Sequence, residues 1–123
     1  MKQNGKINVV LVDDHVLLRN GLAGLINSFD EYTVLFEADN GREFTEKISK
    51  DNPPDLVMLD INMPEMDGYA TAQWLKQHFP LVKILALSMY DNENAIIRMF
   101  KAGTRGYILK DSEPKELKAA LDS

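Results

Sequence analysis

Polar side chains that could do chemistry stand at four places in the sequence where an apolar run ends. Asp13 and Asp14 follow a β-branched run, and Asp60 follows the run Leu-Val-Met-Leu. Ser88 and Lys110 follow two further apolar runs in the same way. Short runs of this kind are typical of strands that are buried on both faces. If the strands are parallel, their carboxyl ends meet at one edge of a sheet, and the four places converge there.

The three carboxylates predict a metal site at that edge. At a separation of 4 Å and an effective dielectric near 20, each pair of carboxylates repels by about 4 kcal/mol. A cation must offset this repulsion, and oxygen ligands without a suitably spaced histidine favour a hard ion such as Mg²⁺. Asp14 and Asp60 are the expected carboxylate ligands, and the main-chain carbonyl of Asn62 is a further one. Asp13 is expected to bind either directly or through water.

Lys110 and Ser88 extend this cluster toward phosphoryl chemistry. A carboxylate can attack phosphorus to give an acyl phosphate. The charge on the transferring group would be stabilised by the metal on one side and by Lys110 on the other. Ser88, between the two, can donate a hydrogen bond to a phosphoryl oxygen.

The elements that must position these residues alternate along the chain. Strands are expected at 7–12, 33–38, 56–60, 83–87 and 106–109. Helices are expected at about 15–28, after Asn40-Gly41 in a short segment containing Phe44 and Ile48, and at about 68–78, 92–102 and 113–121. Alternating strands and helices predict an α/β fold, a single open doubly wound parallel sheet with helices on both faces.

Capping signals predict several of the helix ends. Asp14 or His15 could cap the first helix, and Ser112 is the candidate cap of the last, with Pro114 in its first turn. Gly103 is the expected C-cap residue of the fourth helix. The residues of that fourth helix that are expected to face the core are Ile96, Ile97 and Phe100.

Composition excludes several classes of protein. The 123 residues have the length of one domain, and no apolar stretch approaches the roughly 20 residues that a bilayer-spanning helix needs. The absence of cysteine excludes disulfides and thiolate metal sites, and it fits a cytoplasmic location. A formal charge of −5 makes non-specific binding of nucleic acid unfavourable, so any contact with DNA would have to come from elsewhere.

Together, four segments resemble the receiver domain of two-component response regulators, and the resemblance covers essentially the whole chain, 1–123. The segments are Val12-Asp13-Asp14-His15, Leu59-Asp60-Ile61-Asn62-Met63-Pro64 with Asp67-Gly68, Leu87-Ser88, and Gly106-Tyr107-Ile108-Leu109-Lys110. The resemblance implies a flavodoxin-like (βα)5 domain with strand order 2-1-3-4-5. The Asp-Asp-His and Leu-Lys-Asp sequences are similar to the nitrate-regulator-type (NarL/FixJ-like) subfamily. Its C-terminal helix-turn-helix DNA-binding domain is expected to lie outside these residues.

The resemblance also implies roles for individual residues. Asp60 would be the phospho-acceptor served by a partner histidine kinase, with Asp13 and Asp14 as the acidic pair for Mg²⁺ and with Lys110 and Ser88 contacting the phosphoryl group. The domain would catalyse its own Mg²⁺-dependent phosphorylation and dephosphorylation, without being an enzyme in the usual sense.

A conformational switch is implied as well. Ser88 would move toward the phosphate, and Tyr107 would rotate inward behind it. The motion would reshape the face formed by the fourth helix, the fifth strand and the fifth helix, which could then pair with a second copy of the domain.

Other interpretations compete with this one. Taken singly, an acidic pair after a strand is often a solvated loop, Lys110 would be a surface lysine, Tyr107 a core aromatic, and His15 a capping or packing residue. A phosphohydrolase of the haloacid dehalogenase type would need a second acid where the chain has Asn62. A flavin or nucleotide binder would need a glycine-rich loop after the first strand. A degenerate receiver that acts without phosphate is disfavoured by the complete set of site residues.

Overall fold

The computed structural model describes residues 5–63, 65–89 and 93–123, in which strands and helices alternate as predicted. The strands are β1 (Ile7–Val12), β2 (Tyr32–Ala38), β3 (Leu56–Asp60), β4 (Lys83–Ser88) and β5 (Gly106–Leu109). The helices are α1 (Val16–Ser28), α2 (Gly41–Lys47), α3 (Gly68–His78), α4 (Glu93–Lys101) and α5 (Pro114–Asp122). Within the described ranges, no helix combines the length and the apolar character that crossing a bilayer requires.

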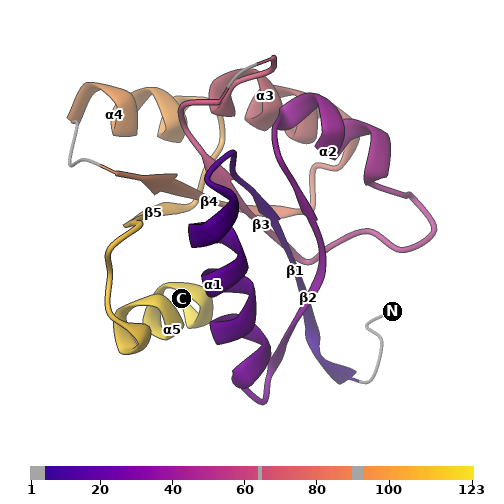
Figure 1. The fold of residues 1–123 in the computed structure, drawn as a ribbon. Coiled ribbons are helices and arrows are strands. Elements are labelled where there is room, and N and C mark those ends of the chain that lie inside the picture. The colour runs from indigo at the N-terminus through magenta and orange to yellow at the C-terminus, as the bar shows by residue number, and fades with distance from the viewer. Residues whose placement is uncertain (1–4, 64, 90–92) are drawn as a thin grey trace.

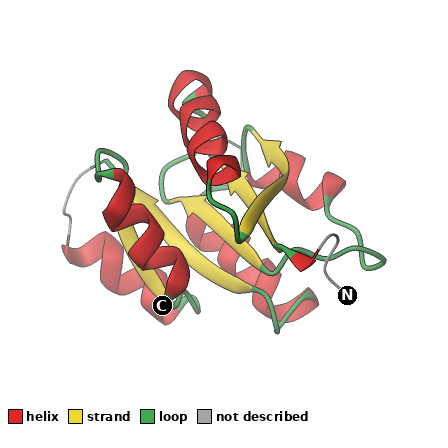
Figure 2. Cartoon of the chain, turned by 90° about the horizontal axis from the view of Figure 1, so that it is seen from below, coloured by secondary structure: helices red, strands yellow, loops and turns green. Residues whose placement is uncertain are grey.

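The five strands form one parallel sheet in the order β2-β1-β3-β4-β5, which confirms the predicted topology. Helices α1 and α5 cover one face of this sheet, and α2, α3 and α4 cover the other (Figure 1). The view in Figure 2 shows the sheet between these two layers. Strand β2 lies at an edge, and its pairing with β1 shifts register between Val9 and Val10.

Alternation along each strand divides the core into two layers. In β1, Val9 and Leu11 pack in the cluster that contains Ile26 of α1 and Leu117 of α5. Val10 and Val12 point to the other side, into the cluster of α2, α3 and α4. All five residues of β3 are buried, as a central strand with helices on both faces requires.

The strand register brings the predicted site residues to one edge. Val12 pairs with Leu59, so the next residues outward, Asp13 and Asp60, lie at neighbouring strand ends. Asp60 pairs with Leu87 and Ser88 pairs with Leu109, which places Ser88 and then Lys110 at the same edge.

One expectation about helix ends is wrong, and another is confirmed only in part. Glu113, not Ser112, caps α5, in a capping box with Glu116 that satisfies backbone N–H groups at both positions. His15 is the N-cap residue of α1, but its side chain makes no capping hydrogen bond. The left-handed φ of +112° at Gly103 confirms its expected place after α4. The predicted helix start at Asn92 and the turn residue Pro64 lie outside the described residues.

The predicted inward face of α4 is partly wrong. Ile96 is buried, but Ile97 and Phe100 are 43% and 46% exposed, and the buried partner is Met99. Ile96 and Met99 are three residues apart and share one side of the helix, which turns Ile97 and Phe100 toward solvent. An apolar side chain in a short helix does not by itself identify the buried face.

Candidate functional site

The structure brings Asp13, Asp60 and Lys110 into direct contact at the carboxyl edge of the sheet. Lys110 Nζ lies 3.0 Å from Asp13 Oδ1 and 3.2 Å from Asp60 Oδ2. All three residues are at most 5% exposed. The strands position them through their backbones, because Asp60 ends β3 and the N–H of Lys110 donates to Ser88 O at 2.8 Å. Lys110 is therefore no surface lysine.

The charges in this cluster are incompletely satisfied. Asp13 Oδ2 and Asp60 Oδ2 are buried without a hydrogen-bond partner among the described residues. Asp60 Oδ2 is close enough to Lys110 for an ion pair but lacks hydrogen-bond geometry. Buried carboxylate oxygens of this kind are costly unless a cation or further donors satisfy them.

The pKa of Asp60 reflects this environment. Burial raises the pKa of its carboxyl to about 7, with a further upward contribution from the charge of Asp13. Lys110 and the backbone N–H of Asn62 act in the opposite direction but do not cancel the effect of burial. The metal-free carboxyl is consequently part protonated near neutral pH.

Close packing of the loop after β3 fixes the backbone at Asp60. The N–H of Gly68 donates to Ile61 O at 3.0 Å, and a side chain at position 68 would approach Asp60 O to 2.4 Å. Glycine is therefore required where α3 begins. Asn62 is exposed, and its N–H lies 3.4 Å from Asp60 Oδ1. The proposed use of the Asn62 carbonyl as a ligand remains a prediction.

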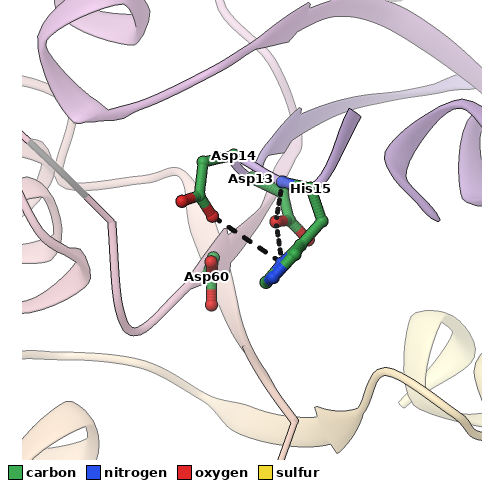
Figure 3. A group of neighbouring side chains, drawn as sticks. All are labelled: Asp13, Asp14, His15 and Asp60. Atoms are coloured by element: carbon green, nitrogen blue, oxygen red, sulfur yellow. Dashed lines mark hydrogen bonds and ion pairs between the residues drawn. The ribbon is translucent and has the colours of Figure 1, made fainter. Parts of the chain in front are cut away.

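Asp13, Asp14, His15 and Asp60 form a group that could hold a metal ion. One ligand atom from each of the four lies within 4.8 Å of the others. Figure 3 shows their side chains converging from the end of β1 and the end of β3. Asp13 and Asp60 are buried, whereas Asp14 and His15 are exposed. The unsatisfied oxygens of Asp13 and Asp60 fit a hard cation.

His15 belongs to this cluster, although the sequence predicts only a capping or packing role for it. Its Nδ1 lies 2.7 Å from Lys110 Nζ and 3.1 Å from Asp13 Oδ1. It can accept from the lysine or donate to the carboxylate, according to its tautomer. Its place directly after Asp13-Asp14 is the only sequence signal for this proximity.

The two predicted switch residues lie on the neighbouring strands β4 and β5 but differ in exposure. Ser88 ends β4 and is buried, as a donor to a group bound at this edge should be. Tyr107 pairs in register with Ala86 and is 40% exposed. Tyr107 is therefore not a core aromatic in this conformation.

Comparison with known proteins now agrees with the geometry. Residues 9–122 match the family model described as the response regulator receiver domain. The chain belongs to this family. It is 36% identical over 121 residues to the nitrate/nitrite response regulator protein NarL of Escherichia coli strain K12, covering 98% of this chain and 56% of that protein. It is 35% identical over 116 residues to the transcriptional regulatory protein DegU of Brevibacillus brevis, covering 94% and 49%.

The fold is also that of a solved receiver. The signal receiver domain of the response regulator NarL from Mycobacterium tuberculosis superposes with a TM-score of 0.86 at 35% identity, and the match covers 95% of this chain and 94% of that one. This receiver domain spans about half the length of NarL from E. coli and of DegU. Its relatives place it among receivers of the NarL and DegU type.

Proposed function

We propose that this receiver domain is a phosphorylation-dependent switch in which Asp60 accepts a phosphoryl group from a partner histidine kinase. The observation that carries the proposal is a buried, unsatisfied Asp60 oxygen only 3.2 Å from the ammonium of Lys110. A carboxylate in this position combines a free nucleophilic oxygen with a fixed cation for the incoming charge.

The proposed metal is Mg²⁺, held by Asp13, Asp14 and Asp60 with the main-chain carbonyl of Asn62. The convergence of carboxylate oxygens within 4.8 Å supports this assignment. When bound, Mg²⁺ supplies positive charge that favours the ionised carboxylates and neutralises phosphoryl oxygens.

In the proposed transfer, an Asp60 oxygen forms a bond to phosphorus while the P–N bond of a phosphohistidine breaks. The imidazole leaves with the bonding electron pair, and the product is an aspartyl phosphate. Lys110 is placed to donate to the phosphoryl oxygens, and the Ser88 hydroxyl is a second donor for them. In the proposed dephosphorylation, the aspartyl phosphate is hydrolysed. A water oxygen bonds to phosphorus, the P–O bond to Asp60 breaks, and inorganic phosphate leaves.

The proposed readout is the face formed by α4, β5 and α5. Movement of Ser88 toward the phosphoryl group would free space behind it, into which Tyr107 would rotate from its half-exposed position. Ile97 and Phe100 already expose apolar surface on α4. A change in this face would alter pairing with a second copy of the domain.

The proposed output is transcriptional control through a C-terminal DNA-binding domain outside residues 1–123. The support is that NarL and DegU are response or transcriptional regulators about twice as long as the matched region. The net charge of −5 agrees with leaving DNA contact to another domain.

The test is incubation with acetyl phosphate and Mg²⁺, followed by intact-mass measurement. We expect a single phosphoryl adduct on the wild type and none on Asp60→Asn. Asp67→Asn is the matched control, because Asp67 lies in the same loop, is exposed and caps α3 through a contact that asparagine can also make. The control should carry the adduct, and an adduct on Asp60→Asn would overturn the assignment.

A further inference from the structure

Arg19 is a buried charge beside the site that the proposed chemistry does not use. Its side chain is only 11% exposed, although it lies on α1, one turn after the helix begins. A buried guanidinium is tolerated only where its donors meet acceptors. Nε donates to Glu37 Oε1 at 2.9 Å, and Nη1 donates to Asp13 O at 2.8 Å and also to Asp39 Oδ1.

The carboxylates of Glu37 and Asp39 hold the Arg19 guanidinium in place. Burial alone would lower the pKa of Arg19, but hydrogen bonds and charge from Asp39 and Glu37 outweigh it and raise the pKa. Glu37 belongs to β2, and Asp39 follows it. Arg19 therefore joins α1 and the end of β2 to a third element, the end of β1.

The contact with β1 is made at the site itself. The Asp13 carbonyl belongs to the peptide bond between Asp13 and Asp14, and a peptide group is planar and rigid. On the other side of the same residue, the Asp13 N–H donates to Ala38 O at 3.0 Å. Both backbone polar groups of Asp13 are thus tied to β2, one of them through Arg19. Rotation of the peptide would move the Asp14 backbone and swing its carboxylate.

We propose that Arg19 is a positioning residue, which holds the Asp13–Asp14 peptide so that both carboxylates face the metal. This inference rests on the proposed function. Arginine suits the task because its fork donates along fixed directions to Glu37, Asp39 and the carbonyl at once, which a lysine ammonium on a flexible stem cannot reproduce. The contact of the guanidinium with this cluster is to the Asp13 main-chain carbonyl, so Arg19 would act on the metal ligands through the backbone.

The test compares Arg19→Lys with Arg105→Lys. Arg105 is exposed and precedes β5, at the opposite edge of the sheet, so its replacement is a matched control. The Mg²⁺ dissociation constant of each variant would be measured by calorimetry. We expect Arg19→Lys to weaken Mg²⁺ binding by about 10-fold, as is typical when a residue that orients a ligand is lost. Arg105→Lys should bind as the wild type does.

A readout without metal separates positioning from a general loss of stability. The carbonyl carbon resonance of Asp13 and the amide resonance of Asp14 should shift in folded, metal-free Arg19→Lys and stay in place in Arg105→Lys. With acetyl phosphate, Arg19→Lys should need more Mg²⁺ for half-maximal phosphorylation, while its rate at saturating Mg²⁺ approaches that of the wild type. A purely structural role would lower the melting temperature without this split.

A milder variant keeps the proposal testable if Arg19→Lys does not fold. Asp39 is 52% exposed, so Asp39→Asn should fold while loosening the guanidinium. Its Mg²⁺ affinity should lie between those of Arg19→Lys and Arg105→Lys. If the wild type takes up phosphate but every variant binds Mg²⁺ equally, the role of Arg19 alone is overturned. If the wild type takes up no phosphate, the proposed function fails and this inference fails with it.

Discussion

The two edges of the sheet treat buried polar groups differently. Each edge leaves two buried side-chain atoms without a hydrogen-bond partner among the described residues. At the amino edge these atoms are neutral, Asn8 Oδ1 and Thr104 Oγ1, whereas at the carboxyl edge they are carboxylate oxygens of Asp13 and Asp60. A neutral group costs far less to bury than an ionised one. The buried carboxylates at the carboxyl edge therefore lower the stability of the metal-free domain, and a bound cation would restore it.

The carboxyl groups of Asp60 and Asp122 allow the difference between the two edges to be measured. Burial raises the pKa of Asp60 at the carboxyl edge, whereas hydrogen bonds from Tyr32 and then Lys118 lower the pKa of Asp122 at the end of α5. Tyr32 begins β2, and its Oη lies 2.5 Å from Asp122 Oδ1. One carboxylate opposes folding and the other supports it. The same substitution, Asp to Asn, should therefore have opposite effects at the two positions.

The largest effect is expected from Asp60→Asn, which should raise the free energy of unfolding at pH 7. The unfolded carboxyl loses its proton near pH 3.8 and the folded one near 7, so the unfolded state binds fewer protons between those values. Wild-type stability therefore falls as the pH rises through this window. The difference between a pKa of 3.8 in the unfolded state and one of about 7 in the folded state corresponds to at most about 4 kcal/mol of unfolding free energy.

Urea denaturation from pH 4 to pH 8 would measure this gain. The gain in unfolding free energy should be largest at pH 7 to 8 and small near pH 4, where the folded carboxyl is protonated and the unfolded one is only partly ionised. Added Mg²⁺ should narrow the difference at pH 7, because it binds the wild-type site more tightly. A gain that is constant over the pH range would show that packing, not charge, is responsible.

The contrast also explains what the sequence predicts well and what it does not. The strand ends, the order of elements and the convergence of Asp60, Lys110 and Asp13 follow from apolar runs and parallel topology, which are properties of the backbone. The positions of His15 and Arg19 depend on which way a side chain turns from α1 or its cap. Periodicity does not encode that direction. An arginine on an amphipathic helix is normally solvated, but here the acceptors Glu37 and Asp39, distant in sequence, and the Asp13 carbonyl draw it inward.

The prediction of the buried face of α4 is partly wrong for a related reason. Ile96, Ile97, Met99 and Phe100 are all apolar, so composition cannot say which two face the sheet. The choice is made by the sheet beneath, where Met99 joins the cluster of α2 and α3. Functional surfaces add to the ambiguity, because residues kept exposed for a partner resemble core residues in sequence.

At the amino edge, Tyr32→Phe should lower stability by a smaller amount. The substitution keeps the buried ring and removes the hydroxyl that donates to Asp122. Because this bond lowers the pKa of Asp122, its contribution is present above the unfolded pKa and is lost as the pH falls below about 4. The melting temperatures of the two proteins should differ at pH 7 and converge in acid.

Asp122→Asn provides the matched comparison with Asp60→Asn. It should lower the melting temperature at pH 7, and Tyr32→Phe in the Asp122→Asn background should cost less than in the wild type. Tyr69→Phe is the control for loss of a phenolic hydroxyl, because the contact of Tyr69 with Arg98 is made by the ring, which phenylalanine keeps. Stabilisation by Asp122→Asn would break the proposed contrast between the edges.

The smallest effect is expected from Glu65→Gly, in the loop that follows Asp60. Glu65 has a φ of 70°, the one left-handed non-glycine residue among those described. That conformation costs an L-residue about 1–2 kcal/mol, and part of the relief is offset by the greater freedom of glycine in the unfolded chain. The ion pair lost with Arg42 is exposed and contributes little. We expect a net gain of about 0.5–1 kcal/mol by denaturant titration.

Glu65→Ala separates the backbone from the carboxylate, because alanine removes the ion pair but keeps the Cβ. Equal stability of the alanine and glycine variants would mean that the strain relieved by glycine is no larger than the entropic cost of glycine in the unfolded chain. If only the glycine variant is more stable, its phosphorylation rate decides what the strain does. An unchanged rate would mean that the strain lowers stability without contributing to phosphorylation. A slower rate shows that the strained loop helps to hold Asp60 in place, so that backbone geometry as well as buried charge sets this edge apart.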